Sequence, residues 1–213
     1  IIDLPGMGKS KLIKPYKIDN LINKIHEVIP EKVAIIGWSL GGQIAMKYYL
    51  KYPNTVSHLV CISSTPCFIN KSGWKFGVSI NFFLKFKKNL LENSQKTLKK
   101  FFKLQIQDNE EGKKIIKKLE NYFIDEQPPT KEGLEKSLKI LEDIDMRNDI
   151  KNINIPTLII SGRQDEITNH KASIWMKSKI KKSKIFIFDM TGHIPFIQNQ
   201  KKCFELIKKF VGP

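Results

Sequence analysis

The sequence has 213 residues, a formal net charge of +16 and a hydrophobic content of 41%. A chain of this length can bury the core of one domain, and its apolar content is ordinary for a globular protein. No run of 18 apolar residues occurs and no signal peptide is recognisable, so we expect no membrane-spanning helix. The few, irregularly spaced cysteines, Cys61, Cys67 and Cys203, predict reduced thiols in a cytoplasmic protein, with no disulfide framework and no metal site.

The positive charge raises the question of a nucleic-acid partner. Only Arg147 and Arg163 are arginines, lysines are spread along the whole chain, and aromatic and basic residues do not interleave as in RNA-binding motifs. We therefore expect no nucleic-acid partner. Residues 71–122 nevertheless contain 13 lysines against 5 acidic residues, which predicts a basic patch suited to an acidic partner.

Four short runs of β-branched and other apolar residues predict buried strands of a parallel sheet, at residues 32–37, 56–63, 156–161 and 184–188. Helical spacing of apolar residues follows or separates them, at residues 40–52, 169–180 and 200–211. Strands that alternate with helices favour an α/β fold, in which helices flank a mostly parallel sheet.

The middle of the chain has a different pattern. From about residue 66 to 145 it has only helical periodicity, interrupted at Pro128 and Pro129, after which Thr130 is suited to cap another helix. We interpret residues 66–145 as a helical lid inserted into a core made of residues 1–65 and 146–213.

Residues 37–42 read Gly-Trp-Ser-Leu-Gly-Gly and match the pattern G-x-S-x-G. A serine hydroxyl is a weak nucleophile unless it is exposed, aligned with a base and close to donors that stabilise the oxyanion. Here Ser39 stands where a predicted strand ends and a predicted helix begins, which is the context that the motif requires. We predict Ser39 as nucleophile and the backbone N–H of Leu40 as an oxyanion donor; the simpler interpretation is a glycine-rich turn with a capping serine.

An acid and a histidine follow Ser39 in the order that such hydrolases use. Asp165 comes directly after a predicted strand, and His193 lies in a loop between the last strand and the last helix. Catalytic groups collect at such carboxyl ends of strands. We predict that Asp165 orients His193, which then acts as base toward Ser39. Glu166 is the neighbouring alternative to Asp165, and a turn aspartate and a solvated loop histidine are the non-catalytic alternatives.

With these motifs in place, the sequence resembles the pimeloyl-[acyl-carrier-protein] methyl ester esterases of the α/β-hydrolase fold. Besides the serine motif, the likeness rests on residues 3–10 (Asp-Leu-Pro-Gly-Met-Gly-Lys-Ser), 63–68 (Ser-Ser-Thr-Pro-Cys-Phe), 138–147, 192–196 and Cys203. The resemblance implies hydrolysis of a methyl ester on a pimeloyl chain carried by acyl carrier protein, in biotin biosynthesis, with no cofactor and no metal. It gives no information on oligomeric state, and we expect a monomer.

The resemblance also implies roles for residues of the lid. Family members bind the acidic carrier protein through basic lid residues, and four lysines stand at those positions: Lys96, Lys100, Lys113 and Lys117. Lysine replaces arginine there, which keeps the charge and loses the bidentate geometry. Substrate contacts are expected from Trp38 and from one lid stretch: Phe101, Phe102, Lys103, Leu104 and Gln105. Lys faces that are merely solvated and Phe side chains that are merely core remain the alternatives.

Family members begin with several strands and a His-Gly turn that supplies a second oxyanion donor, and no such turn precedes Ile1. We therefore expect the first strands of the domain to be missing from this stretch of sequence. Three alternatives to the methyl esterase function stay open. They are a general carboxylesterase, lipase-like or carbon–carbon bond hydrolase of the same fold, a non-catalytic binding protein on this scaffold, and a basic surface protein.

Overall fold

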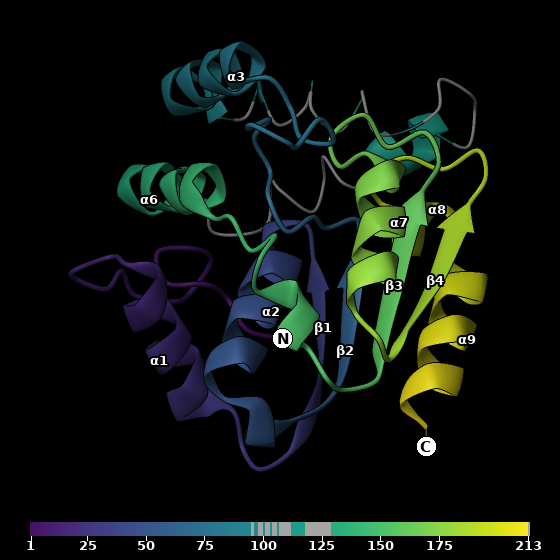
Figure 1. The fold of residues 1–213 in the computed structure, drawn as a ribbon. Coiled ribbons are helices and arrows are strands. Elements are labelled where there is room, and N and C mark those ends of the chain that lie inside the picture. The colour runs from purple at the N-terminus through teal and green to yellow at the C-terminus, as the bar shows by residue number, and fades with distance from the viewer. Residues whose placement is uncertain are drawn as a thin grey trace.

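In a computed structural model of the protein, the described residues are 1–94, 96, 97, 100, 103, 106, 112–117 and 129–212. Their strands form one parallel sheet in the order β1-β2-β3-β4 (Figure 1). The strands are β1 (Val33–Trp38), β2 (Val56–Ile62), β3 (Thr157–Gly162) and β4 (Ser183–Phe188). Each predicted strand is therefore confirmed to within one residue at either end.

Helices cover both faces of this sheet, as the alternating pattern predicts. One face packs against α1 (Ile18–Val28), α2 (Leu40–Lys51) and α7 (His170–Lys179), through a core that includes Leu59 and Ile159. The other face packs against α9 (Gln200–Val211), where Cys203 meets Val60 and Ile160. Helices α2, α7 and α9 match the predicted ranges. Short helical turns complete this part of the chain: η1 (Pro53–Thr55), η2 (Ile150–Asn152) and α8 (Pro195–Gln198).

Helix α1 was not among the predicted elements. Its apolar residues Leu21, Ile22 and Ile25 are buried, and they recur at the helical spacing that places them on one side. Because they pack into the same core as α2, the segment before β1 is an integral part of the layer on this face of the sheet.

Two further helices, α3 (Ile80–Glu92) and α6 (Lys131–Asp143), lie beyond the carboxyl ends of the strands (Figure 1). They pack together through a small apolar cluster of their own that includes Phe83 and Leu138. Thr130 caps α6 as predicted, since its Oγ1 accepts a hydrogen bond from the N–H of Gly133 at 3.0 Å. Among the described residues, no helix is long and apolar enough to cross a membrane.

Candidate active site

Ser39 occupies the sharp turn between β1 and α2. Its backbone has φ 52° and ψ −119°, a region that residues other than glycine rarely adopt. Such a conformation costs about 1–3 kcal/mol and persists only where the surroundings enforce it. Here the N–H of Ser39 donates to the carbonyl of Ile62 at 2.9 Å, and Gly37 has no room for a side chain because the carbonyl of Gly41 lies against it. The chain therefore holds the serine, only partly buried, at the carboxyl end of β1.

Asp165 and His193 come together at the carboxyl ends of β3 and β4. The His193 Nδ1 lies 2.8 Å from Asp165 Oδ2, and both side chains are almost fully buried. Asp165 accepts further hydrogen bonds from the N–H groups of Ile167 and Thr168, each at 2.8 Å, and from Thr168 Oγ1 at 2.6 Å. With so many donors fixing the carboxylate, the ring of His193 has one preferred orientation.

The surroundings of Asp165 favour its charged form. Burial pushes the pKa of this carboxyl upward, but the adjacent His193 and the hydrogen bonds from His193 and Thr168 outweigh burial, so the pKa of Asp165 is lowered. An ionised carboxylate can only accept hydrogen bonds, so it holds the N–H of the imidazole at Nδ1. The pair therefore has the electrostatics of an orienting acid and its histidine.

Leu40 and Trp38 flank the serine. Leu40 is the first residue of α2, where backbone N–H groups lack an acceptor within the helix, and no acceptor for its N–H occurs among the described residues. Trp38 donates its indole N–H to the carbonyl of His193 at 2.9 Å, and its ring packs against Phe196. Trp38, expected to contact substrate, thus ties the His193 loop to the end of β1.

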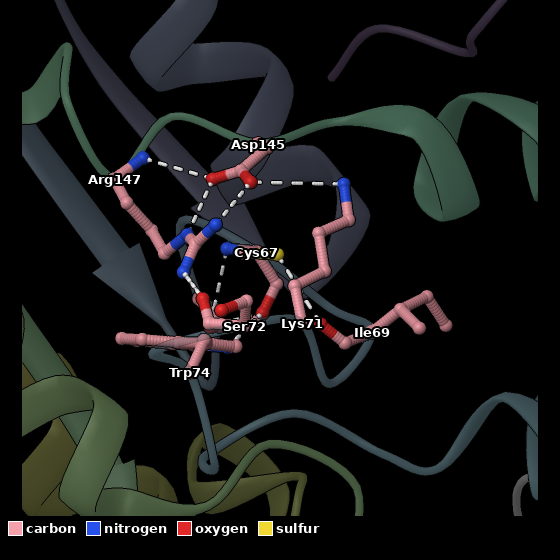
Figure 2. Close-up of polar contacts among 8 residues, drawn as sticks. Cys67, Ile69, Lys71, Ser72, Trp74, Asp145 and Arg147 are labelled. Atoms are coloured by element: carbon pink, nitrogen blue, oxygen red, sulfur yellow. Dashed lines mark hydrogen bonds and ion pairs between the residues drawn. The ribbon is translucent and has the colours of Figure 1, made fainter.

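A polar cluster joins the two segments that lead into and out of the α3–α6 region (Figure 2). Asp145 accepts hydrogen bonds from Arg147 Nε and Nη2, each at 2.8 Å, while Arg147 Nη1 donates to the carbonyl of Ser72 at 2.8 Å. Lys71 Nζ lies 3.7 Å from Asp145, and Cys67 pairs with Asp145 in an antiparallel bridge. We call Lys71, Ser72, Asp145 and Arg147 the basal clamp. The hydrogen bond from Arg147 lowers the pKa of Asp145, against the opposing effect of partial burial.

The lysines predicted to dock the carrier protein, and Lys103 of the predicted substrate stretch, are accessible at the surface. Lys96, Lys100, Lys103, Lys113 and Lys117 are all exposed. Lys96 and Lys100 line a cavity of about 480 Å³, whose other described walls come mainly from α3: Phe82, Lys85, Phe86, Asn89, Glu92, Asn93 and Thr97. The other predicted substrate contacts, Phe101, Phe102, Leu104 and Gln105, lie outside the described residues.

Sequence reasoning missed Thr168 and Ser64, which support the site directly. Thr168 bonds the carboxylate of Asp165 and follows Ile167, whose N–H two residues after the aspartate closes an Asx turn, a local pattern that was present in the sequence. Ser64 donates its hydroxyl to the carbonyl of Ser39 at 2.8 Å. That contact joins residues from different loops, and no local pattern indicates it.

Comparison with known proteins places this geometry in a family. A family model described as the alpha/beta hydrolase fold matches residues 1–200. The chain belongs to this alpha/beta hydrolase family. Among solved structures, an esterase from Exiguobacterium antarcticum superposes on 98% of the chain and 79% of its own, with a TM-score of 0.88 and 25% identity. A bromoperoxidase from Bacillus anthracis has a TM-score of 0.86 at 19% identity, with 98% and 79% covered, and supports the fold alone.

Several curated relatives of this alpha/beta hydrolase carry the same name. A pimeloyl-[acyl-carrier protein] methyl ester esterase of Nitrosomonas europaea is 32% identical over 97% of the chain and 83% of its own length. The protein of the same name from Wigglesworthia glossinidia brevipalpis is 36% identical over 99% of the chain and 82% of its own length. The similarity therefore extends through nearly the whole of this chain.

Proposed function

We propose that this alpha/beta hydrolase is a serine carboxylesterase that removes the methyl ester of a pimeloyl chain carried on acyl carrier protein, a step of biotin biosynthesis. The observation that carries the chemistry is the buried 2.8 Å hydrogen bond between Asp165 and His193, at the same edge of the sheet as a serine held in a strained strand–helix turn. The name shared by relatives over nearly the whole chain supports the substrate.

The proposed reaction proceeds through an acyl-enzyme. With Nδ1 of His193 bonded to Asp165, Nε2 is the nitrogen that takes the proton of the Ser39 hydroxyl as its Oγ attacks the ester carbonyl. The N–H of Leu40 stabilises the oxyanion that forms. His193 then returns the proton to the departing methanol. Water, deprotonated by the same nitrogen, hydrolyses the acyl-enzyme and releases the pimeloyl carboxylate with Ser39 restored.

Replacement of the base tests this assignment. His193→Ala should lower kcat for a short methyl ester by about 10³-fold or more, because the group that takes the serine proton is lost. His170→Ala is the matched control: His170 is a partly exposed histidine at the start of α7, and its loss should leave kcat near the wild-type value. Equal activity of the two variants would remove the triad from the proposal.

An organophosphonate provides an independent test of the nucleophile. The reagent should label the wild-type chain at Ser39, as mapped by peptide mass spectrometry, and should not label Ser39→Ala. A wild-type chain that remains unlabelled would instead favour a non-catalytic binding protein on this scaffold.

The proposed carrier-docking surface lies on the inserted segment, residues 66–145, which we infer to be a lid over the carboxyl ends of the strands. Lys96 and Lys100 are exposed and line the 480 Å³ cavity, and Lys113 and Lys117 are exposed at the same i, i+4 spacing, which places side chains on one helix face. An acidic carrier protein fits such a surface by charge complementarity. The acyl chain is proposed to contact Trp38 and, within the lid, Phe101, Phe102, Lys103, Leu104 and Gln105.

Charge reversal separates docking from chemistry. Lys96→Glu together with Lys100→Glu should raise KM for the carrier-bound ester by about tenfold or more, and should leave a short free methyl ester unaffected. Lys181→Glu with Lys182→Glu is the control, since these exposed lysines lie at the amino end of β4, away from the lid. An equal effect of the lid variant on both substrates would favour the second candidate, a general carboxylesterase. We infer a cytoplasmic location, which the three buried free thiols support.

A further inference from the structure

One peptide group carries both the carbonyl of Ser39 and the N–H of Leu40. A trans peptide is planar, so its carbonyl and its N–H point in opposite directions and rotate together. Whatever fixes the carbonyl of Ser39 therefore also fixes the direction in which the Leu40 N–H points. The proposed oxyanion donor can be controlled from the opposite side of the peptide.

The side chain of Ser64 makes that contact. Its Oγ donates to the Ser39 carbonyl at 2.8 Å, and this is shorter than the two α2 contacts to the same oxygen, from the N–H of Gly42 at 3.0 Å and of Gln43 at 3.3 Å. Ser64 is 2% exposed, so water does not compete effectively for its hydroxyl. A hydrogen bond to a carbonyl also polarises the N–H of the same peptide and strengthens it as a donor.

The surrounding residues hold Ser64 in this place. A Cβ at Gly42 would meet both Cβ and Oγ of Ser64 at 2.6 Å, so glycine at this position is what lets the hydroxyl approach the turn. Gln43 donates from its side chain to the carbonyl of Thr65 at 2.9 Å, which joins the start of α2 to the same loop. Two contacts thus lock the loop after β2 against the turn that carries the nucleophile.

We propose that Ser64 is a positioning residue for the oxyanion site: it orients and polarises the Ser39–Leu40 peptide so that the Leu40 N–H faces the developing negative charge. The inference rests on the proposed serine-esterase function and adds to it a residue that touches neither substrate nor reacting atoms. Its loss should affect the transition state while leaving substrate binding unchanged.

The test is the kinetics of phosphonate inactivation, because the adduct at Ser39 places an oxygen where the oxyanion would be. Ser64→Ala should lower the maximal inactivation rate constant by about 5- to 30-fold, less than the roughly 100- to 1000-fold loss of an entire donor, and should leave the half-saturating concentration unchanged. The kcat for a short methyl ester should fall in parallel at constant KM.

Ser63→Ala is the matched control. Ser63 is the neighbouring serine, it is fully buried, and its hydroxyl has no hydrogen-bond partner among the described residues. Ser63→Ala should therefore keep the wild-type inactivation rate. Ser64→Cys keeps a polar atom at the same position, with a larger sulfur and a weaker donor, so it should be slowed like Ser64→Ala; it also decides the matter if Ser64→Ala does not fold.

The outcomes distinguish the inference from the function on which it rests. A wild-type chain that the phosphonate does not label overturns the serine-esterase proposal and, with it, the role of Ser64. A labelled wild type with Ser64→Ala or Ser64→Cys at the wild-type rate overturns the role of Ser64 alone. Two other results also overturn the role of Ser64 alone. One is a change in Ser64→Ala that is confined to the half-saturating concentration; the other is an inactivation rate that falls equally in Ser63→Ala.

Discussion

The two arginines of the chain offer a direct test of how the basal clamp contributes to stability. Arg147→Lys keeps the positive charge but removes the planar fork, which alone can bond both oxygens of Asp145 and the carbonyl of Ser72 at once. Lysine can retain one of these three contacts. Charge-assisted hydrogen bonds contribute about 1.5–3 kcal/mol each when buried, and the side chains here are 24% and 26% exposed, so we discount the two lost bonds to about 1 kcal/mol each.

The predicted loss is therefore about 2 kcal/mol, which corresponds to a melting temperature lowered by about 4–8 °C for a domain of this size. Arg163→Lys is the control. Arg163 bonds Asp189 as well, but their side chains are 53% and 74% exposed, and a surface pair of this kind contributes less than about 1 kcal/mol. Urea unfolding of both variants measures the difference in free energy of unfolding. If the two substitutions cost the same, or if Arg147→Lys costs less than about 0.5 kcal/mol, the clamp does not stabilise the fold as argued.

Three further predictions concern the site and its surroundings. Trp38→Phe keeps an aromatic ring for the proposed acyl contact but removes the bond to the carbonyl of His193, so kcat should fall while KM changes little; a change in KM alone would show that the bond to His193 does not matter for the chemistry. The pKa of Asp145 is lowered in the folded protein, so its charge stabilises the fold above about pH 4, and this contribution disappears as pH falls through the folded pKa. The free energy of unfolding of wild type should therefore exceed that of Asp145→Asn by less at pH 3 than at pH 7. Urea unfolding at the two pH values measures this difference. Burial raises the pKa of the Cys61 thiol to about 12 and that of the Cys203 thiol to about 11. An aromatic disulfide reagent should therefore react slowly with the native chain, and rapidly with all three thiols after denaturation. Rapid labelling of the native chain would contradict the buried arrangement.

The sheet was predictable because its inner strands, β2 and β3, are largely buried and its edge strands, β1 and β4, are mostly apolar although only partly buried. Such strands appear in the sequence as nearly continuous apolar runs, so residues 156–161 and 184–188 could be recognised without knowing which strands lie next to them. Helix α6 was predictable from Thr130 and the prolines before it. Helix α1 was missed although Leu21, Ile22 and Ile25 carry a helical period.

The positions of Asp165 and His193 were predictable because each follows a strand, and strand ends meet at one edge of a parallel sheet. The contacts that hold these residues and Ser39 in place were not predictable. Ser64 reaches Ser39 across 25 positions in the chain, and the indole of Trp38 reaches His193 across 155. Contacts of this kind depend on how the loops pack in space, which no local pattern encodes. The roles assigned to the lid residues rested on resemblance alone, and they stay predictions.

The bridge between Cys67 and Asp145 has a consequence for how this fold can diversify. Residues 63–156 connect β2 to β3, and the bridge pinches this long connection close to the sheet. Once the bridge has formed, β2 and β3 are joined by a short connection, whatever the length of the segment between the bridge residues. The free-energy cost of closing a longer loop rises only by about 0.6 kcal/mol for each doubling of its length. Insertions, deletions and exchanged helices between the two bridge residues should therefore be tolerated by the strands below. Selection can then rebuild the segment proposed to dock the carrier protein while the parallel sheet and its strand-end loops stay as they are.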